Sequence, residues 1–316
     1  MAKSKEFDLA EYKKTIKDRE VQYKPNSYIP VDPCLQEVLA LDGIPKNHVT
    51  QVYGKSDTGK TSFMFHLAAK CQETKELPVI YITERKVDWE RAKRMGFDKE
   101  GYALVEENFS TLEEVFEDIL DKLAQQGRGE LPKNLVFLWD SIGNTVSKDE
   151  FKEDTSGNVD IKATMMKAAK VIKNYMRHIG PRINNTRKSD CPCNATLIFI
   201  NQAYTAPPPP GSMFSKLTPY GGEGIWYAAS LVIQTKKIGK IEAVVGGITK
   251  KFASKSRFTI EKNHINGMEQ AGDFVITPTS IIPNDAKAIK KYKEENKGNW
   301  ASSENVELEE SEDGEF

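Results

Sequence analysis

The sequence predicts an α/β protein whose mostly parallel, twisted sheet is flanked by helices. One observation is a phosphate-loop motif that stands between a short apolar segment and an apolar helical segment. A second is that short apolar runs rich in β-branched residues alternate with helical patterns along the rest of the chain. This order is typical of parallel sheets.

The phosphate-loop motif is GKSDTGKT at 54–61, which fits the pattern G-x-x-x-x-G-K-[ST] at every position. The glycines let the backbone turn and aim its N–H groups inward, the lysine reaches the β- and γ-phosphates, and the threonine hydroxyl binds Mg²⁺. The N-terminus of the next helix strengthens anion binding. We therefore expect nucleotide binding by Gly54, Lys55, Ser56, Asp57, Thr58, Gly59, Lys60, Thr61 and Ser62, with Thr61 also a metal ligand.

The other elements are predicted from their periodicity. A helix over 110–126 is expected to begin with a capping box of Ser110 and Glu113. A second helix is expected over 161–180, where the lysines Lys167, Lys170 and Lys173 form either a solvated face or a nucleic-acid contact. The apolar runs of strand length are VTQVY at 49–53, VIYI at 79–82, LVFLWD at 135–140, TLIFIN at 196–201 and SLVIQ at 230–234, and the helix after the phosphate loop is SFMFHLAAKCQ at 62–72.

Two segments, 146–160 and 203–220, are expected to be long loops. Each follows the carboxyl end of a predicted strand, which is the edge where open α/β sheets bind ligands. Loops of such length in a compact domain are usually functional or disordered. Both segments are therefore candidates for ligand binding.

Composition favours one large domain with appendages. The chain has 316 residues, 39% of them hydrophobic, which is enough for a substantial core. The sequence has no apolar run of roughly 18 residues, as a membrane span needs, and no signal-peptide pattern, so a cytoplasmic protein is expected. The four cysteines and four histidines suggest neither a disulfide framework nor a metal site, and the CPC at 191–193 fits a loop better than a redox pair.

Charge is distributed unevenly along the chain. The tail at 302–316 carries seven acidic residues and no basic one, while the whole chain has a net charge of −1, so the preceding residues carry about +6. The positive charge of the preceding residues suggests a surface that binds a polyanion, and the acidic tail can compete with the polyanion for this surface. The alternative is a solvated, disordered tail that aids solubility.

Two carboxylates are candidate partners of the phosphate loop. Asp140 ends an apolar strand and can support the Mg²⁺ that Thr61 holds. Glu84 ends the strand at 79–82, which we expect to lie next to the phosphate-loop strand, and it can orient or deprotonate the attacking water. Local sequence leaves open that Glu84 is only a surface carboxylate.

The whole arrangement resembles the RecA family of DNA strand-exchange ATPases, and most closely the RecA-like recombinases of bacteriophages. The resemblance covers residues from about 31 to about 278. It depends on the order of several features, which are GKSDTGKT, Glu84 twelve residues before Gly96 of RMGFD, LVFLWDS, TLIFINQ, the paired glycines Gly221 and Gly222, and IEKNH near Lys262.

The resemblance implies roles for residues around the nucleotide. Glu84 would activate water, and Gln202 would sense the γ-phosphate. Lys262 would complete the site of a neighbouring subunit, with His264 in place of the family's second lysine. Base recognition would involve Asp88 and Arg91, although Arg91 stands where the family usually has an aromatic residue.

The resemblance also places DNA-binding loops near 146–160 and 203–220, within a core at 31–283. Residues 1–30 would form an arm for polymerisation, with Phe7 and Ala10 as candidate anchors, the alternative being a frayed amphipathic helix. Residues 284–316 would form a basic helical stretch and the acidic tail. The four prolines at 207–210 depart from the family and should stiffen the second loop. The DNA contacts expected in and after this loop are Tyr204, Met213, Phe214, Lys216, Gly221 and Gly222.

The sequence thus leads to the hypothesis of a DNA-dependent ATPase that uses ATP and Mg²⁺. It would form a helical filament on single-stranded DNA and promote homologous pairing and strand exchange with double-stranded DNA. Single-strand-binding and loader proteins are possible partners. The alternatives are a hexameric helicase or motor with the same core, and a regulatory recombinase-like DNA-binding module.

Overall fold

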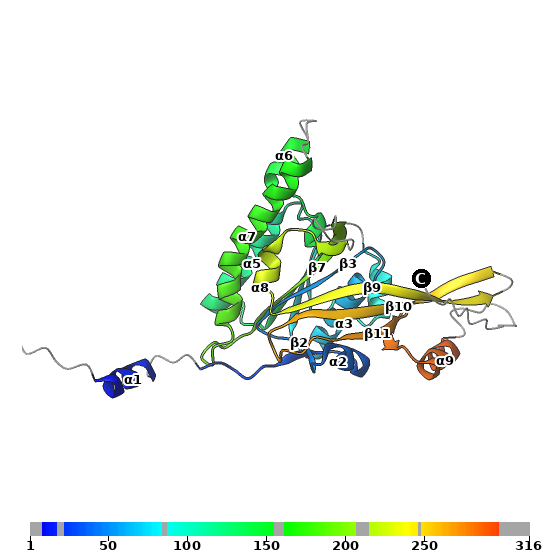
Figure 1. Ribbon diagram of the computed structural model, residues 1–316, viewed down its shortest axis with the longest axis horizontal. Helices are drawn as coiled ribbons and strands as arrows, with labels where there is room; N and C mark the ends of the chain where they lie inside the picture. Colours follow the sequence, from blue (N-terminus) through cyan, green and yellow to red (C-terminus); the bar gives the residue numbers. More distant parts are fainter. Residues whose placement is uncertain are drawn as a thin grey trace, which may run out of the picture.

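The computed structural model describes residues 8–17, 22–83, 87–154, 161–206, 215–245 and 248–296. Within these ranges a large mixed sheet lies between two layers of helices (Figure 1). The helices are α1 (Leu9–Lys17), α2 (Pro33–Leu39), α3 (Lys60–Glu73), α4 (Trp89–Arg94), α5 (Leu112–Arg128), the 3₁₀ turn η1 (Ile142–Asn144), α6 (Lys148–Asp154), α7 (Ile161–Asn185), α8 (Glu223–Ala228) and α9 (Ala286–Glu295).

The sheet has a parallel centre and an antiparallel side. Its order is β12-β11-β10-β9-β3-β7-β6-β4-β5, with β8 paired to β7, and the strands from β9 to β5 run parallel. The strands are β1 (Tyr28–Pro30), β2 (Gly43–Pro45), β3 (Val49–Gly54), β4 (Leu77–Ile82), β5 (Leu104–Glu106), β6 (Leu135–Asp140), β7 (Ala195–Ala206), β8 (Lys216–Pro219), β9 (Leu231–Val245), β10 (Ile248–Asn263), β11 (Ala271–Ile276) and β12 (Ile281–Pro283).

Each face of the sheet has its own hydrophobic core. Side chains of a strand point alternately to the two faces, so Val52 of β3 packs with α2 and α3 while Tyr53 faces α5 and α7. Both residues are at most 1% exposed. The prediction of an α/β fold with a mostly parallel sheet and flanking helices is confirmed.

The predicted position of the strand before Glu84 is wrong. β7 and β6 lie between β3 and β4, so this strand is not the neighbour of the phosphate-loop strand. Parallel strands are joined by crossovers that can pass over intervening positions, which later strands then fill. Order along the chain therefore did not reveal order in the sheet.

The capping box of α5 is one residue later than predicted. The Glu114 backbone N–H donates to Thr111 Oγ1 (3.4 Å), and Glu114 Oε2 accepts from the Thr111 backbone N–H (3.0 Å). The carboxylate of Glu113 is used elsewhere, because it accepts a hydrogen bond from the Lys148 backbone N–H (2.8 Å). A contact between distant segments thus decides between two overlapping capping patterns.

The two segments expected to be loops contain regular structure. Within 146–160 the chain forms α6, which with the start of α7 projects beyond the sheet (Figure 1). Within 203–220 the end of β7 pairs with β8, with Ala203 opposite Pro219. The predicted strand at 230–234 is only the start of β9, which with β10 forms a long two-stranded ribbon that extends past the body of the protein (Figure 1).

Candidate nucleotide site

The phosphate loop leaves the carboxyl end of β3 and leads directly into α3. A Cβ on Gly54 would lie 2.4 Å from the carbonyl oxygen of Thr235, so only glycine lets β9 pass this closely. Gly59, just before α3, has a φ of 94°, in the left-handed region that favours glycine. The backbone itself therefore requires both glycines of the motif.

The lysine and threonine of the motif have defined partners. Lys60 is 7% exposed, and its Nζ donates hydrogen bonds to the carbonyl oxygens of Gly54 (2.9 Å) and Lys55 (2.8 Å). Thr61 Oγ1 donates to Asp140 Oδ2 at 2.6 Å. A buried ammonium within a glycine-containing loop fits a polyphosphate, and a hydroxyl beside a carboxylate fits Mg²⁺. These residues are compatible with ATP and Mg²⁺.

The phosphate loop forms one wall of a cavity of about 380 Å³. Residues of β10 and of the end of β11 also line the cavity, and neither strand was predicted from the sequence. The available signal was the alternation of Phe258 and Ile260 with polar neighbours, which is typical of a half-buried strand. The lining residues are Ser56, Asp57, Gly59, Lys60, Thr61, Ser62, Arg91, Asp140, Gln202, the β10 residues 251–254, and 276–278.

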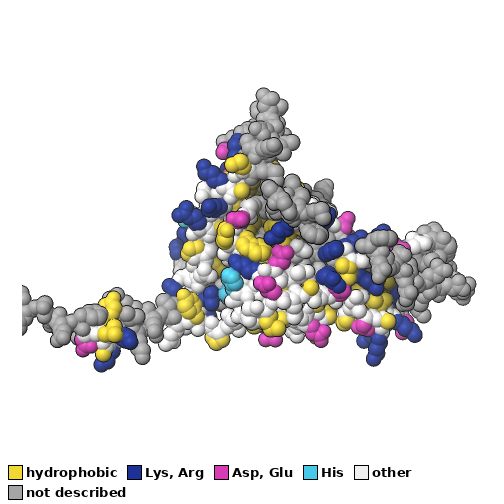
Figure 2. All heavy atoms as spheres, in the orientation of Figure 1, with side chains coloured by type: hydrophobic (Ala, Val, Ile, Leu, Met, Phe, Trp, Pro, Cys, Tyr) yellow, Lys and Arg dark blue, Asp and Glu magenta, His cyan; other side chains and the backbone are white. Residues whose placement is uncertain are grey.

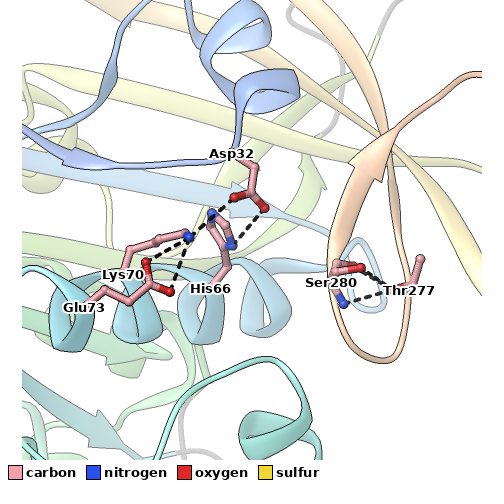
Figure 3. A network of polar contacts seen from close by, with 6 residues as sticks. All are labelled: Asp32, His66, Lys70, Glu73, Thr277 and Ser280. Carbon is pink, nitrogen blue, oxygen red and sulfur yellow. Dashed lines mark hydrogen bonds and ion pairs between the residues drawn. The ribbon is translucent and has the colours of Figure 1, made fainter. Parts of the chain in front are cut away.

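A tight turn after β11 borders the cavity. Thr277 Oγ1 donates to the Ser280 carbonyl oxygen (2.9 Å) and accepts from the Ser280 backbone N–H (2.9 Å) (Figure 3). Thr279 Oγ1 lies 3.0 Å from the hydroxyl of Tyr292, which connects the turn to α9. Helix α9 therefore supports the turn that borders the cavity.

A polar cluster on α3 lies outside the residues that line the cavity. His66 Nδ1 is 3.7 Å from Asp32 Oδ2, and Lys70 Nζ is 3.6 Å from Asp32 Oδ1 and 3.0 Å from Glu73 Oε2 (Figure 3). Burial lowers the pKa of His66. Since Asp32 precedes α2 directly, the cluster connects α2 to α3.

Of the two residues expected to contact the nucleobase, only one lines the cavity. Arg91 lines the cavity, and its Nη2 donates to Ser62 Oγ at 2.8 Å. Burial lowers the pKa of the Arg91 guanidinium. Asp88 is exposed and accepts a hydrogen bond from the Arg91 backbone N–H (3.0 Å), so it caps α4 and does not line the cavity.

Gln202 connects the cavity to the β7–β8 hairpin. It lines the cavity and pairs in register with Gly54 at the start of the phosphate loop. Its carbonyl oxygen accepts from the Tyr220 backbone N–H (3.0 Å), and Asn201 Nδ2 donates to the Tyr220 carbonyl oxygen (2.8 Å). A displacement of Gln202 would therefore reach the end of β8.

Lys262 and His264 do not line the cavity of their own chain. Lys262 is paired with Val232, which is level with Gln51 near the amino end of β3, whereas the phosphate loop follows the carboxyl end. Lys262 Nζ donates to the Trp226 carbonyl oxygen (2.7 Å), and partial burial lowers its pKa. His264 is exposed.

The described candidates for DNA binding gather around α7 and β8. Lys170 and Lys173 are exposed on α7 and Lys167 is half-buried, while Lys216 is exposed on β8 and the Tyr204 ring lies 5.1 Å from that of Tyr220. Added Cβ atoms on Gly221 and Gly222 would lie 2.7 Å and 3.2 Å from Ile172 and Ala169 of α7, and both glycines have positive φ. Close packing against α7 thus requires this glycine pair.

Three candidate residues, Glu84, Met213 and Phe214, lie outside the described residues. The same holds for Phe7, the prolines at 207–210 and the acidic tail. Ile82, which ends β4, is paired with Asp140, so the described part of this strand ends level with the proposed metal ligand. None of the described helices is long and apolar enough to cross a membrane.

The strand–loop–helix unit, the parallel sheet and the lined cavity define a phosphate-loop protein. The family of the RecA N-terminal domain matches residues 17–278, so the chain belongs to the RecA family. It is similar to Protein RecA of Rickettsia massiliae (27% identical over 282 residues, covering 87% of this chain and 74% of the relative). It is also similar to Protein RecA of Aquifex aeolicus (24% over 265 residues, covering 83% and 68%).

Proposed function

We propose that this protein is an ATP-dependent DNA recombinase that forms a helical filament on single-stranded DNA and promotes homologous pairing and strand exchange. The observation that carries the proposal is the position of Gln202. This residue lines the cavity, and its carbonyl oxygen accepts a hydrogen bond from the Tyr220 backbone N–H at the end of the β7–β8 hairpin, within the segment proposed to bind DNA. Membership of the RecA family supports the same function.

Nucleotide binding is assigned to the phosphate loop. Lys60 exchanges its carbonyl partners for phosphate oxygens, and Thr61 and Asp140 hold Mg²⁺. Bound Mg²⁺ neutralises charge on the phosphates. Glu84 orients and deprotonates the attacking water, and the products are ADP and phosphate. Loss of the γ-phosphate removes a contact from Gln202, which lowers the affinity of the loops for DNA.

The second half of the site is assigned to a neighbouring subunit. Lys262 and His264 do not line the cavity of their own chain, which is compatible with a role at the nucleotide of the next subunit. The arm at 1–30 joins subunits in this proposal. Leu9 and Tyr12 on α1 are 54% and 53% exposed, so their apolar surface is available for contact with a neighbouring subunit.

DNA binding is assigned to the segments 146–160 and 203–220 and to the lysines of α7. Single-stranded and double-stranded DNA are the partners, with single-strand-binding and loader proteins as further ones. We infer action in a bacterial cytoplasm, and we further propose that the protein is encoded by a phage, as the resemblance of its sequence motifs implies.

The test is ATP hydrolysis with and without single-stranded DNA across a salt series. We expect stimulation that is strongest at low salt, where phosphate contacts contribute most, and its loss in Lys60→Ala and Glu84→Gln. Absence of stimulation at low salt would refute the proposal. Electron microscopy is the second readout, since closed rings with strand displacement would indicate a motor instead of a filament.

A further inference from the structure

The β9–β10 ribbon packs directly against the phosphate loop. Thr235 Oγ1 of β9 lies 2.6 Å from Thr58 Oγ1, and Ser256 Oγ of β10 donates to the Thr58 carbonyl oxygen at 3.2 Å. Thr58 and Ser256 are buried. Both strands of the ribbon therefore contact the loop, which holds the ribbon beside the nucleotide cavity.

The ribbon carries lysines to the rim of the cavity. Side chains two residues apart on a strand share a face, so Lys237 follows Thr235 on the face that meets the phosphate loop, and it is paired with Ser256. Lys251, further along β10, lines the cavity together with Asp57. Lys and Arg side chains gather over β9 and β10 in the space-filling view (Figure 2).

These lysines repel one another. Partial burial lowers the pKa of the Lys251 ammonium, and Lys237, within hydrogen-bonding reach, lowers it further. Lys240 of β9 acts in the same sense, whereas Asp57 of the phosphate loop acts in the opposite sense. Positive charge held together at the rim of a cavity is stabilised by an anion that enters it.

We propose that Lys251, together with Lys237, binds phosphate oxygens of the nucleotide held by the phosphate loop of the same subunit. This rests on the proposed function, because it takes the cavity to be the ATP site. The ribbon then adds positive charge to the cavity that Lys60 also lines, and both lysines contact the polyphosphate. Lys250 provides a control, since it is exposed on the same strand and does not line the cavity.

The test measures binding to the full-length protein. A fluorescent ADP analogue is displaced by ATP and by inorganic tripolyphosphate, which carries the phosphates without a base. We expect Lys251→Gln to weaken both competitors about tenfold, as expected for one lost charged hydrogen bond, and Lys250→Gln to bind like the wild type. Thermal melting confirms that both variants are folded.

Lys60→Ala distinguishes a failure of this inference from a failure of the proposed function. If Lys60→Ala loses binding and Lys251→Gln does not, the inference is overturned while the proposed function stands. If Lys60→Ala binds normally, the cavity is not the nucleotide site and both fail. Loss of affinity for single-stranded DNA in Lys251→Gln, with unchanged tripolyphosphate binding, assigns the ribbon to DNA and also overturns the inference.

Proton uptake gives an independent readout. A bound anion raises the pKa of Lys251. When the pH is near the pKa that Lys251 has in the unbound protein, binding of tripolyphosphate is therefore accompanied by proton uptake. Calorimetry in two buffers of different ionisation enthalpy measures this uptake. We expect less uptake in Lys251→Gln than in Lys250→Gln, and equal uptake in the two variants would contradict the inference.

Discussion

Gly59→Ala tests whether the phosphate loop depends on backbone shape. Gly59 has a φ of 94°, and an added Cβ would lie 1.9 Å from Ile276 Cδ1. The left-handed conformation costs a residue with a Cβ about 1–2 kcal/mol, and the forced displacement of Ile276 adds about 1–3 kcal/mol. We expect the free energy of unfolding to fall by about 2–5 kcal/mol, and nucleotide affinity to fall with it.

Two further variants divide this cost into its parts. Gly129 has a φ of 76°, but an added Cβ would meet nothing within 4 Å, so Gly129→Ala carries only the conformational cost of about 1–2 kcal/mol. Ile276→Val removes the clashing methyl group and alone costs about 0.5–1.5 kcal/mol. In the Gly59→Ala background we expect Ile276→Val to restore stability, with an interaction free energy between the two substitutions of about 1–3 kcal/mol.

The assay is urea denaturation followed by circular dichroism, at one fixed protein concentration because self-association adds to apparent stability. Affinity for a fluorescent ADP analogue is measured in parallel. The reasoning is refuted if Gly59→Ala costs no more than Gly129→Ala, or if Ile276→Val adds its full cost in the Gly59→Ala background.

Two more predictions concern stability. Burial, with a contribution from Arg187, lowers the pKa of His48 to about 4 from 6.5. Between pH 6.5 and about 4 the unfolded chain therefore binds more protons than the folded protein. The free energy of unfolding should fall by up to about 3 kcal/mol as the pH is lowered through this range. In His48→Gln the free energy of unfolding should depend less on pH in this range, and an unchanged pH dependence would contradict the role of His48. Thr111→Ala should cost about 1 kcal/mol in urea denaturation because it removes the cap of α5, and an equal loss in Ser110→Ala would contradict the observed cap.

The strands at 49–53, 79–82, 135–140 and 196–201 were predicted correctly because each is an apolar run buried on both faces. β10 was not predicted, because its apolar residues are separated by lysines and serines. Beyond the short alternation at Phe258 and Ile260, pairing with β9 and β11 explains why so polar a segment is a strand. Strand propensity depends on such neighbours more than on the segment itself.

The proposed site was predictable in the same uneven way. Lys60 and Thr61 belong to a motif whose local geometry follows from its own glycines, and Asp140 ends a strand that the sequence shows clearly. Lys251 has no such motif. It reaches the cavity because β10 pairs with β9, and β9 pairs with β3.

The sequence alone was sufficient to predict the phosphate loop from Gly54 to Thr61 and the main buried strands. The pattern of apolar residues and the backbone freedom of glycine are properties of a few consecutive residues. The folded chain was needed to separate β4 from β3, to choose Thr111 as the cap, and to bring residues of β10 to the cavity. These features depend on contacts between segments far apart in sequence. Such contacts are set by the packing of the whole sheet, which no local pattern encodes.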